Sequence, residues 1–399
     1  MILIDDNNKN KCCGCTACSC ICPQGAIEMK EDAEGFLYPV VDKDKCINCG
    51  LCDKVCPYNL NKDIKSESKE AYAIQNKDET ILHTSTSGGF FSAICSYVIS
   101  SNGYVCGATF DEKFNVIHKM VNTLEETVKF RGSKYVQSNL GDIFTEIKKK
   151  LDEGKLVCFS GTPCQVLGLK KFLQKDYENL ITVDFVCRSV PSPALWIEYL
   201  SYQEKKYNSK IKEVYFRSKT YGYHSGTMTI FFENGKKYTG SNRVDLYNKS
   251  FHSNKVSRYS CYNCPAKGFD RVSDFTVFDS WKPDMLSKEL IDNDKGFSNL
   301  IIHSQKGKNI FEDVKKQFNV YKIEASEAAA YTGKMLEESI KMPEDRKVIY
   351  NDILNGNLIK VKKYVSISVL DKLFEKSKKI LYKLNILKYL KKVKENIKK

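Results

Sequence analysis

Two cysteine repeats near the N-terminus constrain the fold of this chain more than any other feature. Each repeat has the spacing C-x2-C-x2-C-x3-C-P. The first contains Cys12, Cys15, Cys18, Cys22 and Pro23, and the second contains Cys46, Cys49, Cys52, Cys56 and Pro57. Spacings this short let backbone amides wrap one corner of a cubane cluster. The proline ends the loop at the point where the chain leaves the cluster. The repeats therefore predict a small domain folded around inorganic clusters.

The doubled spacing is that of the bacterial two-cluster ferredoxin, in which the fourth cysteine of each repeat ligates the other cluster. We therefore assign a first [4Fe-4S] cluster to Cys12, Cys15, Cys18 and Cys56. A second is assigned to Cys46, Cys49, Cys52 and Cys22. The alternative is a pair of zinc knuckles, but zinc favours two C-x2-C pairs separated by a longer loop. Clusters of this kind pass electrons and perform no substrate chemistry, so the remaining chain is expected to hold what they serve.

The predicted ferredoxin domain has two further features. Cys13 and Cys20 fall outside the register of the first repeat, and we interpret them as neighbours of the clusters rather than as ligands. Residues 26–46, between the repeats, are expected to form a β-hairpin followed by a return strand. The domain is thus a small α+β unit of the bacterial ferredoxin type.

Composition and charge narrow the class of protein. No basic N-terminal region followed by an apolar segment is visible, and no stretch approaches eighteen consecutive apolar residues. These features predict a cytoplasmic protein, whose thiols stay reduced and bind metal. Residues 361–399 hold thirteen Lys against Asp371, Glu375 and Glu395, so +10 of the net +14 lies there. The rest of the chain carries only +4, which argues against nucleic acid as a partner.

After a polar segment at residues 61–70, apolar runs of strand length alternate with helical ones. Strands are predicted at residues 71–75, 104–110, 156–159 and 181–186, and helices at residues 88–101, 139–151, 163–174 and 193–207. This alternation predicts an α/β fold with a mainly parallel sheet. A hairpin around Asn234-Gly235 makes a mixed sheet the expectation.

Four isolated cysteines are candidates for a third [4Fe-4S] cluster. Cys164 follows a predicted strand, and Thr162 and Pro163 fit the N-cap and first position of a helix whose dipole favours a thiolate. Cys187 ends another strand, so both lie at the carboxyl edge of the sheet, where open α/β folds place their sites. A C-x2-C pair completes the set with Cys261 and Cys264. The alternative is that these four cysteines are separate buried thiols. We interpret the remaining cysteines, Cys95, Cys106 and Cys158, as small core residues.

Six ordered motifs resemble the coenzyme F420 hydrogenase/dehydrogenase beta-subunit family, fused behind a ferredoxin module. They are TSGGFFSAI (86–94), RGSKYVQS (131–138), FSGTPCQVLGL (159–169), DFVCRSVPSP (184–193), CYNCPAKGFDRVSDFTVFDSW (261–281) and DKGFSNLII (294–302). The resemblance implies a flavoprotein with FAD beside a [4Fe-4S] cluster, moving electrons between clusters and a hydride carrier. The expected organisation is a ferredoxin domain at 1–62, a linker at 63–70, a region at 71–150 like the N-terminal part of the beta subunit, a flavin and iron–sulfur region at 151–350 like its C-terminal part, and a basic helical tail at 351–399.

The same motifs imply contacts to the flavin. Thr86, Ser87, Gly88 and Gly89 open a helix, where glycines let backbone amides approach a phosphate or flavin and the helix N-terminus favours an anion. A polar group that could face the flavin ring consists of Arg131, Ser133, Lys134 and Gln137. A cation there would stabilise a reduced, anionic flavin. Without the resemblance, the alternatives are a simple turn and a solvated helix start.

Two departures from the family pattern concern the substrate side. The family usually has Cys-His-Gly where this chain has Cys187-Arg188-Ser189, and Gly-Asp-Phe-Trp-Gly where it has residues 278–282, FDSWK. An arginine does not shuttle protons as a histidine does. The redox scaffold is therefore better supported than the electron acceptor, and no catalytic residue is assigned. Bacterial relatives also lie in cell-surface polysaccharide pathways, a role that altered substrate motifs would fit.

The C-terminal tail has apolar residues at helical spacing, with lysines on the other face. The apolar positions are Leu370, Leu373, Phe374, Ile380, Leu381, Leu384, Leu387, Leu390 and Val393. A basic amphipathic helix can lie on an anionic membrane surface. The alternative is a helix docked on its own domain or on a partner protein. The protein is thus expected either free in the cytoplasm or at the inner face of the membrane.

Two functional hypotheses follow. In the first, the chain is an oxidoreductase whose FAD exchanges hydride with a small molecule. In the second, it is an electron-transfer subunit, and the chemistry takes place on a partner protein. A zinc-bound interaction module is disfavoured by the doubled cysteine spacing.

Overall fold

The computed structural model describes residues 4–59, 65–354, 358–384 and 386–387, and the statements below concern these residues. The N-terminal region carries the hairpin of β1 (Ile27–Glu31) and β2 (Leu37–Val41), with Ile27 opposite Val41. Two short helices flank it, α1 (Ala17–Ile21) and α2 (Leu51–Lys54). The predicted hairpin is confirmed. The return strand is wrong, because residues 42–50 form turns and a loop that carry Cys46 and Cys49 before α2 begins.

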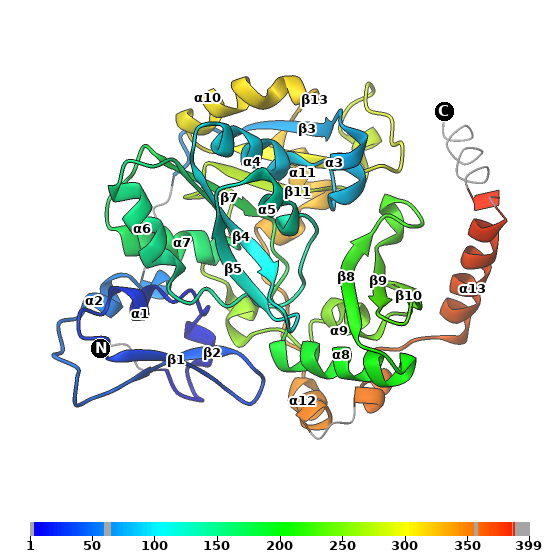
Figure 1. The fold of residues 1–399 in the computed structure, drawn as a ribbon, viewed down its shortest axis with the longest axis horizontal. Helices are drawn as coiled ribbons and strands as arrows, with labels where there is room; N and C mark the ends of the chain where they lie inside the picture. Colours follow the sequence, from blue (N-terminus) through cyan, green and yellow to red (C-terminus); the bar gives the residue numbers. More distant parts are fainter. Residues whose placement is uncertain (1–3, 60–64, 355–357, 385, 388–399) are drawn as a thin grey trace.

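An eight-stranded mixed sheet forms the centre of the molecule (Figure 1), in the order β13-β3-β12-β11-β7-β6-β4-β5. Its strands are β3 (Glu70–Asn76), β4 (Tyr104–Phe110), β5 (Val116–Val121), β6 (Val157–Ser160), β7 (Leu180–Phe185), β11 (Phe275–Ser280), β12 (Phe297–Ile302) and β13 (Phe318–Ile323). Strands β4, β6, β7 and β11 are parallel, and the outer pairs are antiparallel. The predicted α/β class and mixed sheet are confirmed.

Helices cover both faces of this sheet. Alternate side chains point to opposite faces, so Cys158 and Ile181 pack with α4 (Phe90–Ser100) and α10 (Gln305–Val314). On the other face, Val157 and Leu180 pack with α6 (Ile143–Asp152) and α7 (Pro163–Leu173), and α11 (Ala325–Thr332) covers β3 and β12. Smaller helices are α3 (Glu79–Thr84) and α5 (Leu124–Thr127).

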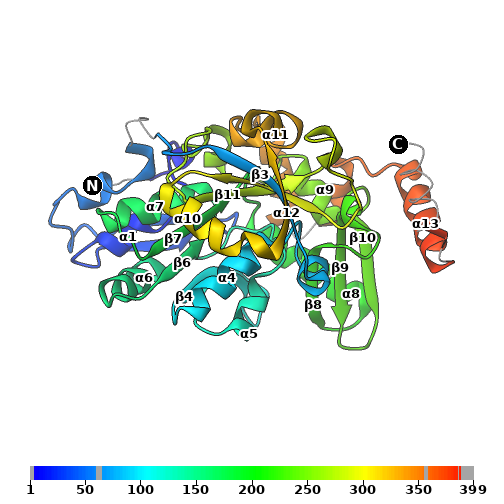
Figure 2. The same ribbon diagram turned by 90° about the horizontal axis from the view of Figure 1, so that it is seen from above.

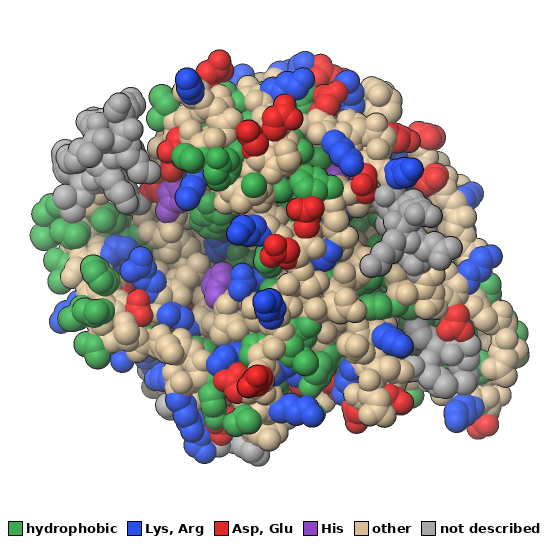
Figure 3. Space-filling view, turned by 180° about the vertical axis from the view of Figure 1, so that it is seen from behind, with side chains coloured by type: hydrophobic (Ala, Val, Ile, Leu, Met, Phe, Trp, Pro, Cys, Tyr) green, Lys and Arg blue, Asp and Glu red, His purple; other side chains and the backbone are tan. Residues whose placement is uncertain are grey.

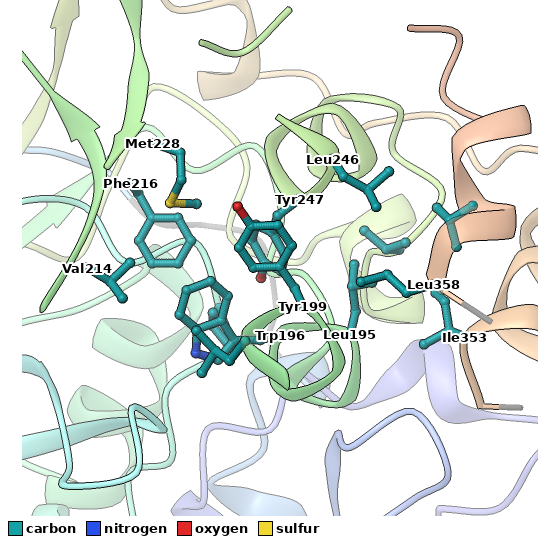
Figure 4. Packing of buried hydrophobic residues seen from close by; sticks show 14 of the residues in the cluster. Leu195, Trp196, Tyr199, Val214, Phe216, Met228, Leu246, Tyr247, Ile353 and Leu358 are labelled. Atoms are coloured by element: carbon teal, nitrogen blue, oxygen red, sulfur yellow. The ribbon is translucent and has the colours of Figure 1, made fainter. Parts of the chain in front are cut away.

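A second unit contains an antiparallel three-stranded sheet of β8 (Ile211–Ser218), β9 (Thr227–Phe232) and β10 (Lys237–Ser241). It packs on α8 (Pro193–Tyr207), α9 (Leu246–His252) and α12 (Arg346–Leu354). Figure 4 shows its core, where Trp196 and Phe216 lie 4.7 Å apart between ring centroids. Helix α13 (Val369–Lys383) lies at the opposite end of the molecule from the cysteine-rich region (Figures 1 and 2).

Several predicted boundaries are confirmed, and one needs correction. The strand at 104–110 and the helix at 193–207 match residue for residue, and Cys95, Cys106 and Cys158 are buried core residues as predicted. The helix expected at 139–151 begins only at Ile143, because Asn139 pairs with Ile117 and Gly141 has a φ of +50°. Nothing in the hydrophobic pattern predicted β5, β8 or β13.

The central sheet contains strands from two of the regions into which the chain is expected to divide. Regions 71–150 and 151–350 both contribute strands to the eight-stranded sheet, so they share one core. Part of the predicted linker, residues 63–64, lies outside the described residues, and its last residue, Glu70, already belongs to β3. Of the predicted tail helix, residues 388–399 with Leu390 and Val393 lie outside the described residues. No helix in the described ranges is both long and apolar enough to cross a bilayer.

Candidate functional site: three thiol sets and a cavity

Two small cavities of about 20 Å³ in the N-terminal region are lined by the two predicted cluster sets. One is lined by Cys22, Cys46, Cys49 and Cys52, together with neighbouring backbone and apolar residues. The other, which we call the first-set cavity, is lined by Cys12, Cys15, Cys18 and Cys56, the first cluster set, and also by Cys13. Within the described residues, no three His, Cys, Asp or Glu side chains lie close enough to bind a single metal ion. Four thiols around a cavity are the donor set of a four-iron cluster, so these residues fit that group.

The local backbone explains how the cysteine loops curl around these cavities. Gly14 and Gly50 have φ values of +69° and +75°, a conformation that glycine adopts without strain. The amide of Ala26 donates a hydrogen bond to Cys22 Sγ at 3.3 Å. Burial raises the pKa of Cys18 far above that of a free thiol, and the neighbouring Cys12 and Cys56 raise it further. A metal that replaces the thiol proton removes this cost, so the site favours metal over free thiols.

The four isolated cysteines lie near one another at the carboxyl edge of the sheet. Cys164 is the second residue of α7, whose N-cap Thr162 forms a capping box with Gln165. The loop after β7 carries Cys187, and the short 3-10 helix Tyr259–Asn263 carries Cys261 and precedes Cys264. Burial, followed by the proximity of Cys261, Cys164 and Cys264, raises the pKa of Cys187 well above its usual value. These four thiols form what we call the third thiol set.

Two features modify the expectation for the third thiol set. The helix dipole favours a thiolate at Cys164, but a hydrogen bond with Cys13 and burial outweigh it and raise the pKa of Cys164. Lys267 donates a hydrogen bond to the carbonyl oxygen of Cys187 at 2.8 Å. Because Lys267 is a cation beside several thiols, it would offset part of the negative charge of a thiolate-bound cluster.

The first cluster set and the third thiol set are in contact through the residues between them. Cys13, which lines the first-set cavity, also lies beside Cys164 and raises the pKa of its thiol. The hydroxyl of Tyr58 donates to the carbonyl oxygens of Ser260 and Asn263 at 3.3 and 3.4 Å. The ferredoxin-like region therefore packs directly against the loop that carries the third thiol set.

Arg258 is the central residue of this contact, and sequence reasoning missed it. It is fully buried, and its Nε donates to the carbonyl oxygen of Cys12 at 2.7 Å. One terminal nitrogen donates to Cys12 Sγ at 3.4 Å, and the other donates to Gln137 Oε1 at 2.8 Å. The only signal in the sequence is that Arg258 stands three residues before Cys261.

A cavity of about 440 Å³ opens beyond the carboxyl ends of β6, β7 and β11, between the central sheet and the second unit. Six of the eight predicted flavin contacts line it: Thr86, Ser87, Gly89, Arg131, Ser133 and Lys134. The other two, Gly88 and Gln137, do not. A Cβ on Gly88 would lie 2.3 Å from the carbonyl oxygen of Ile74, so this glycine serves close packing against β3. Gln137 instead donates to the carbonyl oxygen of Cys13 at 3.0 Å, toward the ferredoxin-like region.

The predicted flavin contacts are held in place by hydrogen bonds. Thr86 Oγ1 accepts from the amide of Ser133 at 2.8 Å, which joins the two motifs. Ser87 and Ser298 are linked through their hydroxyls at 2.7 Å. Lys134 donates to the carbonyl oxygen of Lys129 at 2.8 Å, and burial lowers the pKa of Lys134 to about 7. A site with these cations and amides is suited to an anionic ligand.

The far wall of the cavity comes from the second unit and from the loop after Cys187. Arg217 on β8 forms an ion pair with Asp279 at 2.6 Å and lies 4.6 Å from the ring centroid of Trp281. His252 is nearby, and burial, with Arg188 and Arg217 as further causes, lowers its pKa to about 4. Arg188 donates to Asn254 Oδ1 and to the carbonyl oxygen of His252. The positions that depart from the family pattern therefore meet at one end of the cavity.

Three residues that line the cavity each have one buried polar atom without a hydrogen-bond partner among the described residues. These atoms are His118 Nδ1, one terminal nitrogen of Arg217 and Asn242 Oδ1. A buried polar group without a partner costs about 1–3 kcal/mol. All three atoms therefore favour a polar ligand in the cavity. None of these residues lies in a recognisable motif, so the sequence carried no signal for them.

Comparisons with known proteins identify two parts of the chain. Residues 154–327 match the family described as the C terminus of the coenzyme F420 hydrogenase/dehydrogenase beta subunit. Residues 11–60 match the 4Fe-4S dicluster domain. No curated protein sequence matches the chain.

A solved structure with a similar chain is the xenon-derivatized F420-reducing [NiFe] hydrogenase complex from Methanosarcina barkeri. The identity is 17%, the match covers 78% of this chain and 97% of that chain, and the TM-score is 0.44. The resemblance inferred from the motifs is thus confirmed by the two family matches. The chain thus carries a match to the 4Fe-4S dicluster domain near its N-terminus, followed by a match to the family described as the C terminus of the coenzyme F420 hydrogenase/dehydrogenase beta subunit.

Proposed function

We propose that the chain is an iron–sulfur flavoprotein oxidoreductase that passes electrons between its [4Fe-4S] clusters and an FAD. The single observation that carries this proposal is the position of Cys187. It belongs to the third thiol set, and it also lines the large cavity. A cluster bound by that set and a cofactor bound in the cavity would be neighbours. The contact of Cys13 with Cys164 extends this arrangement back to the first cluster set.

The cavity fits a flavin cofactor in size and chemistry. Its volume of about 440 Å³ lies in the range of roughly 300–1,000 Å³ that cofactor sites occupy. Four basic side chains line it: Arg131, Lys134, Arg188 and Arg217. The two carboxylates in the lining, Asp279 and Asp184, are already engaged with Arg217 and Thr276. The excess of positive charge favours the pyrophosphate of FAD or an anionic substrate.

The residues of the chain bind and orient the cofactor in this proposal. FAD supplies the conversion between one-electron transfer and hydride transfer when bound. Thr86 and Ser133 fix the loop at the start of α4, and Gly89 has a φ of +83°, a conformation that glycine adopts without strain. Lys134 holds a proton or releases it near pH 7, because burial lowers its pKa to about 7.

The electron partners follow from the same arrangement. A redox protein would exchange electrons with the dicluster domain, and a small-molecule hydride carrier would enter the cavity. The arginine in place of the usual histidine at position 188 favours anion binding over proton transfer at that end. Cell-surface polysaccharide biosynthesis is the pathway that we propose from the resemblance. Reduced thiols for cluster assembly would place the protein in the cytoplasm.

Metal and flavin analysis tests the proposal. The protein is purified without oxygen, and iron, acid-labile sulfide and flavin are measured per chain. Three cubane clusters and one FAD predict about twelve iron atoms and one flavin. Eight iron atoms and no flavin would limit the chain to the dicluster domain and contradict the proposal.

The alternative is an electron-transfer subunit with no substrate site of its own. The two functions are separated by reducing the flavin with dithionite and then offering small-molecule acceptors. Rapid reoxidation by a small acceptor in the absence of any partner protein supports the enzyme. Reoxidation that occurs only when a partner protein is present supports the electron-transfer subunit.

A further inference from the structure

Helix α13 is attached to the molecule by its polar side. Glu375 is buried and accepts hydrogen bonds from the amide and hydroxyl of Ser241 on β10, at 3.2 and 2.7 Å. Tyr382 packs edge-on against Tyr221, with 5.0 Å between ring centroids. Lys379 donates to the carbonyl oxygen of Thr239. The face that most amphipathic helices turn to water is here the face that docks on the protein.

The apolar side of the same helix is exposed. Its side chains are between roughly half and three-quarters accessible: Val369 is 72% exposed, Leu370 65%, Leu373 54%, Phe374 61%, Ile380 49% and Leu384 60%. Large apolar side chains that gather on one exposed face mark an interaction surface. Figure 3 shows hydrophobic side chains interspersed with lysines and arginines at the edge of the molecule where α13 lies.

Helical geometry shows that these residues form one stripe. At about 100° per residue, the apolar positions from Val369 to Leu384 fall within an arc of roughly 140°. Glu375 falls roughly opposite the middle of that arc. Docking through Glu375 therefore turns most of the apolar stripe away from the protein.

The charges around the stripe identify what would cover it. Lys372, Lys376 and Lys383 are exposed along its edge. The two acidic residues of the helix face the protein: Glu375 contacts Ser241, and Asp371 lies 3.9 Å from Lys249. The outer surface of α13 thus carries apolar side chains and cations but no carboxylate.

We infer that α13 binds the protein peripherally to an anionic membrane surface, with its apolar stripe inserted among the lipids. An apolar stripe flanked by lysines has the chemistry of an interfacial helix, since lysines attract anionic headgroups while leucines enter the acyl region. A second copy of the chain is the less suitable occupant. Residues 361–399 carry a net charge of +10, so two such surfaces would repel each other.

The position of α13 gives this attachment a consequence for electron transfer. The dicluster domain and α13 lie at opposite ends of the molecule in both views (Figures 1 and 2). A membrane bound at α13 would leave the dicluster domain free to meet a redox partner. The inference does not depend on the proposed flavin or on the third thiol set.

Vesicle co-sedimentation of the full-length protein tests this inference. Wild-type protein is mixed with vesicles of phosphatidylglycerol and phosphatidylcholine, and in parallel with vesicles of phosphatidylcholine alone. We expect binding to the anionic vesicles, little binding to the neutral ones, and weaker binding as salt is raised. The double variant Leu370→Glu/Leu373→Glu should lower the bound fraction roughly tenfold or more, since it places charges in the inserted stripe.

The matched control is Ile291→Glu, which adds a charge at an apolar side chain that is 59% exposed but distant from α13 in the chain. This variant should bind vesicles as the wild type does. Absence of wild-type binding to anionic vesicles would overturn the inference, as would equal binding by the double variant. A dimer that the double variant converts to monomers, without any vesicle binding by either protein, would instead assign the stripe to a second copy.

Discussion

The guanidinium of Arg258 contacts Cys12 twice, at the carbonyl oxygen (2.7 Å) and at Sγ (3.4 Å). Arg258 lies three residues before Cys261 of the third thiol set, whereas Cys12 belongs to the first cluster set. It is also stacked on Tyr38, with 4.0 Å from the guanidinium carbon to the ring centroid. A buried cation thus lies between the first cluster set and the third thiol set, where the dicluster domain packs against the rest of the molecule.

Replacing Arg258 by methionine should make the reduction potential of the first cluster more negative. Reduction adds a negative charge, and the cation and its N–H···S bond stabilise that charge. A loss of about 1.4 kcal/mol of such stabilisation corresponds to about 60 mV for one electron. Redox titration followed by electron paramagnetic resonance measures this shift in the anaerobically purified protein.

Arg258→Lys is the control for this prediction, because it keeps the positive charge and loses the forked hydrogen bonds. Its potential should lie between those of the wild type and Arg258→Met. An unchanged potential in Arg258→Met, with the iron content intact, would show that Arg258 only joins the two domains.

Replacing Cys261 by serine should lower the iron content by about four atoms per chain. Cys261 lies close to Cys264, Cys164 and Cys187, and burial is the main cause that raises the pKa of its thiol to about 12. A thiol this reluctant to ionise alone is a suitable ligand when a metal takes the place of its proton. Iron and sulfide analysis of the purified variant measures the change.

Cys13→Ala and Cys20→Ala are the matched variants for the cysteines outside the repeat register. Cys13 lies beside Cys164 and lines the first-set cavity, and Cys20 Sγ lies 3.8 Å from the carbonyl oxygen of Gly141. Both variants should keep the full iron content. Loss of four iron atoms in either one would mean that the assignment of ligands within the first repeat is wrong.

The cysteine spacing predicted which thiols line each small cavity, because the geometry of a cluster sets the spacing of its ligands. Cys12 and Cys56 are distant in the chain, yet the rule that the fourth cysteine crosses to the other cluster placed them around one cavity. Likewise, Cys164 and Cys187 follow neighbouring parallel strands, so sheet topology alone brought them to one edge.

The remaining parts of the site depend on contacts between distant segments, which local patterns do not encode. Arg217 reaches the cavity because the three-stranded sheet packs beside β11, where Arg217 pairs with Asp279. The motif resemblance predicts that Gln137 faces the flavin, but Arg258 and the carbonyl oxygen of Cys13 draw it toward the dicluster domain. The amphipathic pattern of α13 predicted a helix but not its orientation, which a single buried carboxylate, Glu375, decides.

Lys134→Met should change how stability depends on pH. Burial lowers the pKa of Lys134 to about 7, so between pH 7 and about 10 the unfolded chain binds a proton that the folded chain does not. The free energy of unfolding of the flavin-free protein should therefore rise with pH across this window, by roughly 1 kcal/mol per unit. In Lys134→Met this rise should be smaller, as measured by urea unfolding at a series of pH values.

A nearby exposed lysine provides the control for Lys134. Lys129→Met removes a charge from the same segment, but its side chain is exposed. The pH dependence of Lys129→Met should match that of the wild type. Equal slopes in all three proteins would mean that Lys134 remains charged in the folded state.

Glu375→Ala should detach α13 from the second unit. The substitution leaves the amide and hydroxyl of Ser241 without their acceptor, which costs about 1–3 kcal/mol for buried donors. The neighbouring Lys378, 3.1 Å from Glu375, also loses its ion pair. Hydrogen exchange of the amides in Val369–Lys383 should become faster, while exchange in the central sheet should not change.

The pH dependence of this contact has a definite sign. The hydroxyl of Ser241 and the ion pair with Lys378 hold the pKa of Glu375 below its ordinary value, against the opposing effect of burial. The docking of α13 is therefore stable above the ordinary pKa of a glutamate, about 4.3, and is lost as pH falls through the lower, folded-state pKa. Protection of the α13 amides that persists in Glu375→Ala at neutral pH would show that Tyr382 and Lys379 hold the helix without the carboxylate.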